Sequence, residues 1–337
     1  MKKDIGIDLG TANTLVYIKS KGIVINEPSV VAVDRETSAV LSVGDMAKEM
    51  IGKTPENIAA VSPLKNGVVA DFDAAQAMLK FFMKKAFAKN GLIKPRLVVS
   101  VPSEVTSVER RAVEEAAIEA GAREVHLIEG TMAAAIGANL PIDEPVASMI
   151  VDIGGGTSEV AVISLGGIVT GKTLRIAGDA FDLAIARHVK KAYNLIIGQP
   201  TAEKIKISIG SAFNVNDGET LEVKGRDSIT GLPQNVTLTA KEVREAMADS
   251  IMAIVDAIKL TLEHTPPELA SDIIDRGITI TGGGALLRGM NLIIEQETGM
   301  RVTIAETPLD CVANGTGKVL DELDMLKKDL PAFKRGW

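Results

Sequence analysis

The sequence predicts an α/β fold built from two related lobes, and three observations indicate it. The chain has 337 residues, which corresponds to about two domains of ordinary size. Short apolar runs typical of strands alternate along it with amphipathic segments typical of helices. A unit of strand, aspartate, glycine-bearing turn and strand occurs twice, around Asp8 and around Asp152. The repeat favours two copies of one design.

The first half opens with a β-hairpin, because apolar residues alternate on both sides of a turn at Gly10–Asn13. Residues 97–101 form a continuous apolar run, which is typical of a strand buried on both faces. Thr106 and Glu109 form a capping-box pattern at the start of a helix. We expect strands at 4–9, 15–18, 30–33, 97–101 and 125–128, and helices at 73–89, 107–120 and 131–139.

The second half repeats this opening with strands at 149–153 and 160–163 around a turn at Gly154–Thr157. Thr239 and Glu242 predict the start of a long helix that ends at Pro266–Pro267. We expect further helices at 179–193, from about 285, and at 313–326, a shorter α+β piece up to 239, and a strand at 278–281.

The composition excludes several function classes. The 44 acidic and 37 basic residues give a net charge of −7, which argues against a general nucleic-acid binder. Aromatic residues make up 3% of the chain, so few rings are present to stack on bases or sugars. Cys311 is the only cysteine, and the sequence shows neither a signal peptide nor an apolar run long enough for a membrane span. We therefore expect a cytosolic protein.

The two glycine-bearing turns suit the phosphates of a nucleotide. Backbone N–H groups in such turns can approach phosphate oxygens closely because no Cβ intervenes. The aspartate before each turn, Asp8 or Asp152, could hold a hydrated Mg²⁺. The alternative is that Asp-Gly pairs are simply favourable hairpin turns. A third glycine-rich turn, Gly282–Gly284, favours the nucleotide interpretation.

One literal nucleotide motif is rejected by its context. Residues 166–173 match the P-loop pattern, but a P-loop must open a helix. Residues 172–176 instead continue in strand-like alternation, which predicts a hairpin. A P-loop NTPase remains as an alternative, and a helix that begins at Lys172 would indicate it.

Five segments carry a family resemblance. In order, they resemble the nucleotide-site segments of the superfamily of actin, sugar kinases and heat-shock chaperones, and most closely the MreB family of bacterial actins. Long stretches such as VDIGGGTSEVAVISLGGIVTGK are similar to that family almost residue by residue. The five segments are Ile5–Thr14, Ser62–Asp71, Val151–Val160, Ile278–Arg288 and Pro308–Lys318.

The resemblance implies an actin-like, duplicated ribonuclease H-like fold with ATP or ADP and Mg²⁺ in the cleft between the lobes. Lobe I would comprise residues 1–145 and 313–337, with a small subdomain at about 33–65. Lobe II would comprise 146–312, with a small subdomain at about 182–240.

The resemblance also assigns residues to the nucleotide. Asp8 and Asp152 would hold the metal through water. Glu203 and Lys206 would contact the ribose, although these residue types alone favour a solvated helix face. The phosphates would lie against Gly10, Thr11, Ala12, Asn13, Gly154, Gly155, Gly156 and Thr157, and the adenine against Gly282, Gly283 and Gly284.

One position departs from the family pattern. MreB proteins read Glu-Glu-Pro after the strand near 127, and the second Glu, with the residue matching Thr157, positions the water that attacks the γ-phosphate. Gly130 and Thr131 occupy the second and third places here. Glycine cannot orient a water, so we expect slow hydrolysis. Glu129 is the candidate substitute, although adjacent residues point in different directions.

The resemblance further implies filaments at the inner face of the cell membrane. Leu92 and Ile93 form an apolar doublet that could insert into anionic lipid, unless it folds back onto the preceding helix. Trp337, in a basic tail, is a second candidate anchor unless the tail is disordered. Basic residues surround the doublet in the sequence, at Lys84, Lys85, Lys89, Lys94 and Arg96.

We therefore expect an ATP-binding filament protein that governs cell shape or serves a specialised shape or motility role. Its expected partners are further copies of itself, paired as double protofilaments, together with the membrane, membrane-anchored cell-shape proteins and paralogous filaments. The alternative is a conventional ATP-hydrolysing enzyme or chaperone ATPase of the same fold. A chaperone would need a substrate-binding domain after residue 320, for which this sequence leaves no room.

Overall fold

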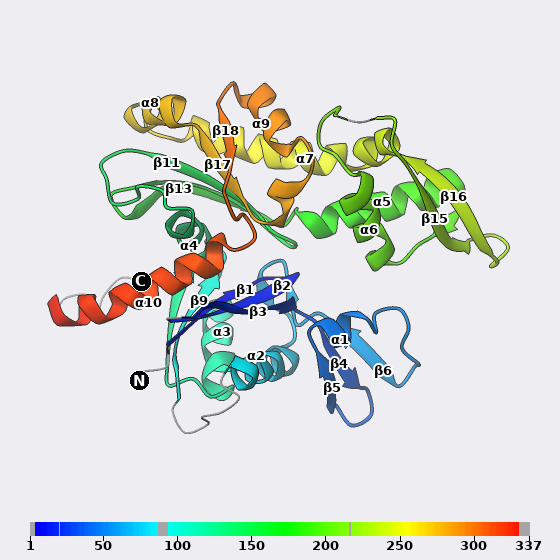
Figure 1. The fold of residues 1–337 in the computed structure, drawn as a ribbon, viewed down its shortest axis with the longest axis horizontal. Helices are drawn as coiled ribbons and strands as arrows, with labels where there is room; N and C mark the ends of the chain where they lie inside the picture. The colour runs from blue at the N-terminus through cyan, green and yellow to red at the C-terminus, as the bar shows by residue number, and fades with distance from the viewer. Residues whose placement is uncertain (1–3, 20, 87–93, 216, 330–337) are drawn as a thin grey trace.

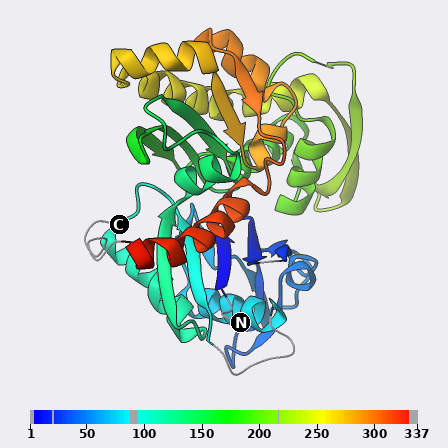
Figure 2. The same cartoon turned by 60° about the vertical axis from the view of Figure 1, so that its left-hand side comes forward.

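The computed structural model describes residues 4–19, 21–86, 94–215 and 217–329 (Figure 1). Its two largest sheets have five strands each and lie in the two halves of the molecule. Helices cover both sheets, as expected for an α/β fold. Turning the molecule by 60° shows the red helix α10 (Cys311–Asp329) between the two halves (Figure 2).

The first sheet has the strand order β10-β9-β1-β2-β3. Strands β1 and β2 form the predicted antiparallel hairpin, and β9 pairs in parallel with both β1 and β10. Every residue of β9 is buried, which confirms the interpretation of its apolar run. The strands are β1 (Asp4–Leu9), β2 (Asn13–Ile18), β3 (Gly22–Pro28), β9 (Arg96–Val101) and β10 (Glu124–Glu129).

Two helices bury their apolar faces against this sheet. Helix α3 (Ser107–Glu119) begins with the predicted capping box between Thr106 and Glu109. Helix α2 (Phe72–Ala86) contributes Met78, Phe82 and their neighbours to the core that also contains Ile5, Ile7 and Val99. A small three-stranded sheet and a short ribbon complete this half: β4 (Val31–Asp34), β5 (Val40–Val43), β6 (Ile58–Val61), α1 (Asp45–Lys48), β7 (Leu64–Lys65) and β8 (Val68–Val69).

The second sheet has the order β13-β12-β11-β17-β18 and repeats the plan of the first. In both sheets three antiparallel strands are followed by two that run parallel to the first strand of the hairpin. This shared order supports the duplication that the two aspartate turns indicate. The strands are β11 (Ser148–Ile153), β12 (Ser158–Ser164), β13 (Gly167–Leu174), β17 (Ile278–Thr281) and β18 (Val302–Ile304).

The helices of this half hold the largest core, which contains Phe181, Ile185 and Ile254. Helix α7 (Ala240–Glu263) begins with the predicted capping box of Thr239 and Glu242. The remaining elements are α5 (Gly178–Tyr193), α6 (Gln199–Ile209), β14 (Leu195–Ile196), β15 (Thr220–Asp227) and β16 (Pro233–Thr239).

The prediction was incomplete between 266 and 300. A helix that the sequence interpretation missed, α8 (Pro267–Arg276), follows the two prolines directly, since proline is well tolerated in a first helical turn. The helix expected from about 285 is instead a short 3₁₀ turn, η1 (Gly283–Leu286), followed by α9 (Met290–Thr298). Gly289 separates the two with a φ of 74°.

Helices α4 (Gly130–Gly137) and α10 pack together where the halves meet. Helix α10 also contacts β1 and β9, whereas α4 contacts β11 and β12 of the second sheet. A separate apolar core joins α4 and α10 to Ile150, Ala161 and Ile163. The two halves are therefore connected by a packed layer as well as by the chain. The expected lobe boundaries remain predictions.

Candidate functional site

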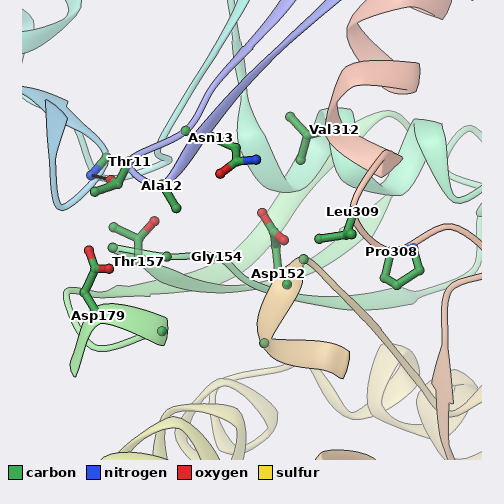
Figure 3. A pocket seen from close by; sticks show the side chains of 18 of the residues that line it. Thr11, Ala12, Asn13, Asp152, Gly154, Thr157, Asp179, Pro308, Leu309 and Val312 are labelled. Carbon is green, nitrogen blue, oxygen red and sulfur yellow. Dashed lines mark hydrogen bonds between the residues drawn. The ribbon is translucent and has the colours of Figure 1, made fainter. Parts of the chain in front are cut away.

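A cavity of about 510 Å³ lies between the two halves. Figure 3 shows that residues of several elements point into it, among them Thr11, Asp152 and Asp179. Both glycine turns that follow the paired aspartates line it, together with the third glycine turn. The predicted residues on its wall are Asp8, Gly10, Thr11, Ala12, Asn13, Gly130, Asp152, Gly154, Gly155, Gly156, Thr157, Glu203, Lys206, Gly282, Gly283 and Gly284.

The two turns approach each other so closely that side chains would collide. A Cβ on Gly155 would lie 2.6 Å from Ala12 Cβ, and one on Gly156 would lie 2.5 Å from Thr11 Oγ1. Ordinary Cβ contacts are longer than 3 Å, so both positions require glycine. The Thr11 hydroxyl accepts a hydrogen bond from the Gly67 N–H at 2.8 Å. The two turns together form a glycine cradle that lines the cavity.

The third turn is fixed against the end of strand β11. A Cβ on Gly282 would crowd Asp152 Oδ1, and one on Gly284 would overlap the Ile153 side chain. Gly282 also has a φ of 79°, which favours glycine. The Gly282 N–H donates to the Pro308 carbonyl oxygen at 2.9 Å. These contacts place Leu309 beside the turn, on the cavity wall.

Three carboxyl groups gather on this wall. Burial raises the pKa of Asp8 to about 6, against a hydrogen bond from Ser100 Oγ at 3.0 Å that lowers it. Burial, with the charges of Glu159 and Asp8, raises the pKa of Asp152 well above its ordinary value. Burial raises the pKa of Glu159 to about 7, although two hydrogen bonds from Ser103 lower it. Each group would be stabilised in its charged form by a nearby cation.

The donor set fits Mg²⁺ that is bound together with phosphate. Mg²⁺ is usually held by one or two carboxylates, several waters and substrate phosphates, rather than by a cage of protein ligands. Within the described ranges, no three His, Cys, Asp or Glu side chains form a metal-binding group. Asp8 and Asp152 supply the two carboxylates that such a site needs, and both lie beside the glycine cradle where phosphates could complete the coordination.

Glu203 and Lys206 lie on the cavity wall rather than on a solvated helix face. Lys206 Nζ lies 2.8 Å from Asp182 Oδ1 and donates to the Gly178 carbonyl at 3.1 Å. Glu203 Oε2 lies 2.9 Å from Nζ of Lys48, which comes from the opposite half of the molecule. Burial raises the pKa of Asp182 to about 6, opposed by Lys206. Helix α6 therefore closes one side of the cavity.

The expected substitute for the family's second Glu is not on that wall. Glu129 is absent from the lining residues, and its Oε1 lies 3.7 Å from Arg110 Nη2 on α3. Gly130 does line the cavity, as the first residue of α4. The carboxyl nearest to it is Glu159, whose oxygens would lie 3.7 and 3.9 Å from a Cβ at that position.

The sequence interpretation did not single out Glu159, Asp179 or Asp182, which also line the cavity. Glu159 lies on β12, two residues after Thr157, so its closeness to the turn at Gly154–Thr157 was a usable signal. Asp179 and Asp182 lie in the first turns of α5, whose first N–H groups donate to the carbonyl oxygens of Gly154 and Gly155. No sequence motif marked this contact.

Several other predictions concern the surface. Residues 167–174 form strand β13 of a hairpin, so the P-loop alternative is wrong. Arg96 is 2% exposed and pairs with Asp4, so it does not belong to a basic ring around the apolar doublet. Leu92, Ile93 and Trp337 lie outside the described residues. Within the described part of the chain, no helix has the length and apolarity needed to cross a membrane.

Comparison with known proteins agrees with this architecture. The model of the MreB/Mbl protein family matches residues 2–328. The cell shape-determining protein Mbl of Bacillus subtilis strain 168 is 51% identical over 326 residues, covering 97% of this chain and 98% of the relative. The cell shape-determining protein MreB of Escherichia coli K12 is 52% identical over 332 residues, covering 97% and 96%.

Solved structures extend the comparison to the fold. The crystal structure of MreB5 of Spiroplasma citri bound to ADP has a TM-score of 0.91 and 38% identity, covering 98% of this chain and 99% of that one. The MamK double helical filament has a TM-score of 0.82 at 22% identity, covering 96% and 99%, a likeness of fold alone. The fold is therefore actin-like, as expected, and the chain belongs to the MreB/Mbl family.

Proposed function

We propose that the protein binds ATP and ADP with Mg²⁺ in the cavity between its halves and assembles into filaments that govern cell shape. The observation that carries this proposal is the close contact between the two glycine turns, which line one cavity together with two aspartates. Such turns are suited to phosphate oxygens. The S. citri MreB5 structures similar to this chain contain ADP or AMPPNP.

The proposed roles of the residues follow their places on the wall. Asp8 and Asp152 hold Mg²⁺ through water, and the metal neutralises phosphate charge when it is bound. The turns at Gly10–Asn13 and Gly154–Thr157 hold the phosphates. Glu203 and Lys206 contact the ribose, and Gly282–Gly284 border the adenine. Relatives named cell shape-determining proteins support the cellular role.

We further propose that the filaments are double protofilaments on the inner face of the membrane. The Leu92–Ile93 doublet supplies the apolar contact, and Lys84 and Lys94 are exposed basic residues beside it in the sequence. Membrane-anchored cell-shape proteins and paralogous filaments are the proposed further partners. The location is cytoplasmic and peripheral to the membrane.

We propose that hydrolysis is slow, because Gly130 offers no side chain to orient the attacking water. A conventional ATP-hydrolysing enzyme or chaperone ATPase of this fold is the alternative. Phosphate release from assembled protein distinguishes the two: Gly130→Glu should release phosphate at least about tenfold faster than the wild type. Equal rates in the two proteins would overturn the argument from Gly130.

Nucleotide binding is tested with a fluorescent ATP analogue and Mg²⁺. Gly156→Val places a side chain against Thr11 and should abolish binding. Gly218→Val is the matched control, because a Cβ there meets no atom within 4 Å. Electron microscopy of the wild type and Gly156→Val with ATP, with and without anionic lipid, then tests assembly. Binding by Gly156→Val equal to that of the control would contradict the proposed site.

A further inference from the structure

Glu159 is a carboxylate on the cavity wall to which the proposed nucleotide contacts give no role. It lies on β12 opposite Asp152 of β11 in the antiparallel register, so both side chains project from the same side of the sheet. The side chain is 5% exposed, yet it lines the cavity together with Thr157 and Gly130. A carboxyl group in such a place requires partners.

In the described part of the chain, the surrounding residues donate hydrogen bonds to one carboxylate oxygen of Glu159 and not to the other. Oε2 accepts hydrogen bonds from the Ser103 N–H and from Ser103 Oγ, both at 3.1 Å. Ser103 Oγ in turn lies 3.1 Å from Thr131 Oγ1. Among the residues that the structure describes, no hydrogen-bond donor reaches Oε1. The carboxylate is thus oriented through Oε2, and Oε1 is left to accept a hydrogen bond from a ligand or water.

The residues at the start of α4 make this arrangement possible. Gly130 carries no side chain, and a Cβ there would stand 3.7 and 3.9 Å from the two oxygens of Glu159. A longer side chain at position 130 would therefore grow into the space beside the carboxylate. Thr131, the next residue, is fully buried and supplies the hydroxyl that contacts Ser103. Gly130 leaves space beside the Glu159 carboxyl group, and Thr131 contacts the serine that holds it.

We propose that Oε1 of Glu159 orients the water that attacks the γ-phosphate, with Ser103 and Thr131 as positioning residues. This inference rests on the proposed binding of ATP in the cavity. The water oxygen forms a bond to the γ-phosphorus while the bond from that phosphorus to the β–γ bridging oxygen breaks, and its electron pair leaves with ADP. One proton of the water passes to Oε1 and then to the released phosphate. Glu159 thereby supports the slow hydrolysis that remains without a side chain at Gly130.

The principal test is Glu159→Gln, which keeps the shape and can still accept a hydrogen bond from Ser103. Its amide nitrogen cannot accept a hydrogen bond from water. We expect single-turnover phosphate release with Mg²⁺ and ATP to fall at least about tenfold, since a positioned base contributes about 10²–10⁴ in rate. The dissociation constant for the fluorescent ATP analogue should stay within about threefold of the wild type. An unchanged rate, or a rate lost together with ATP binding, would overturn the proposal.

A second measurement requires no turnover. ADP with aluminium fluoride and Mg²⁺ mimics the transferring phosphoryl group with its attacking water, and transition-state analogues bind more tightly than ground-state ligands. The wild type should bind this complex more tightly than ADP, and Glu159→Gln should lose most of that difference while its affinity for ADP is kept. Equal preference in both proteins would contradict the role. Failure of the wild type to bind ADP would instead refute the proposed function.

Two further variants separate orientation from folding. Ser103→Ala removes one of the two bonds that orient Oε2, and should lower phosphate release by less than Glu159→Gln does. Gly130→Glu combined with Glu159→Gln supplies a carboxylate from the neighbouring position, and should recover release relative to Glu159→Gln alone. No recovery in a folded, ATP-binding double variant would count against water orientation in this corner of the cavity.

Discussion

Three acidic side chains, those of Asp8, Asp152 and Glu159, line the same cavity in a low-dielectric environment. Burial is the first cause of the raised pKa of each. Raised pKa values at a cleft are common at functional sites. The cluster destabilises the folded protein when it is charged, so the proposed binding of nucleotide and Mg²⁺ would increase folding stability.

For single residues, the sequence predicted the site residues that belong to recognisable motifs. It missed those whose surroundings come from segments far away in the chain. Asp8 and Asp152 precede recognisable turns, so their position at the ends of strands could be inferred. The environment of Glu159 depends on Ser103, a residue of a distant loop. Nothing in the local sequence shows that these two segments meet.

Glu159 makes the stability of the nucleotide-free protein depend on pH. Its pKa is raised from 4.5 to about 7 in the folded state, so the folded protein holds a proton that the unfolded chain releases. This stabilisation is complete below about pH 4.5 and is lost as the pH rises through 7. Urea unfolding without Mg²⁺ should therefore show Glu159→Gln gaining stability relative to the wild type between pH 4.5 and 8, by at most about 3 kcal/mol.

The control for this measurement is Glu114→Gln, at an exposed position on α3. Its stability difference from the wild type should not change over the same pH interval. A difference between Glu159→Gln and the wild type that is equally constant would show that Glu159 does not hold this proton.

Among the elements, helices α4 and α10 cross at a contact that requires a glycine on each helix. A Cβ on Gly137 would overlap the carbonyl oxygen of Cys311, and one on Gly315 would overlap the carbonyl oxygen of Ala133. Each helix thus presents a glycine to the backbone of the other. Because α4 also packs on β11 and α10 on β1, this crossing connects the two halves.

The helix boundaries show what local signals can predict. Both capping boxes marked true helix starts, because the bonds that define them lie within four residues. Helix α8 was missed because its two prolines, at 266 and 267, were interpreted only as a stop. The turn at Gly282–Leu286 depends on contacts with Ile153 and Pro308, which the local sequence does not contain.

The crossing predicts that Gly137→Ala and Gly315→Ala are each destabilising. The added methyl group must push two helix backbones apart, and overpacking of this kind costs about 1–3 kcal/mol. Chemical unfolding should show that loss for both variants. Gly218→Ala, in open space, should change stability by less than about 0.5 kcal/mol. Variants as stable as the control would mean that the helices separate without cost.

At the scale of the whole molecule, the matching strand orders of the two sheets agree with the repeated aspartate turns. Aromatic residues make up 3% of the chain, and Phe181 is the one aromatic residue among those that line the cavity in the described structure, where glycine turns and carboxyl groups face apolar side chains. How the halves meet could not be predicted from the sequence. The ion pair between Lys48 and Glu203 joins residues 155 positions apart and connects α1 to α6 across the cavity.

This ion pair should act as a latch on nucleotide release. Lys48 Nζ lies 3.1 and 2.9 Å from the two carboxylate oxygens of Glu203, with both side chains about one-third exposed. A pair that is exposed to this extent contributes about 0.2–1 kcal/mol. Lys48→Ala should therefore speed release of a fluorescent ATP analogue by about 1.4- to fivefold when the complex is mixed with excess ATP. Lys53→Ala, which changes an exposed lysine of the same small sheet region, is the control and should leave the rate unchanged.

Because salt screens exposed charges, higher ionic strength should speed nucleotide release from the wild type and have less effect on release from Lys48→Ala. If Lys48→Ala and Lys53→Ala release nucleotide at one rate and respond equally to salt, then the pair is a surface contact that plays no part in closing the cavity. A faster rate in Lys48→Ala alone would show that separation of the two halves at this point limits release.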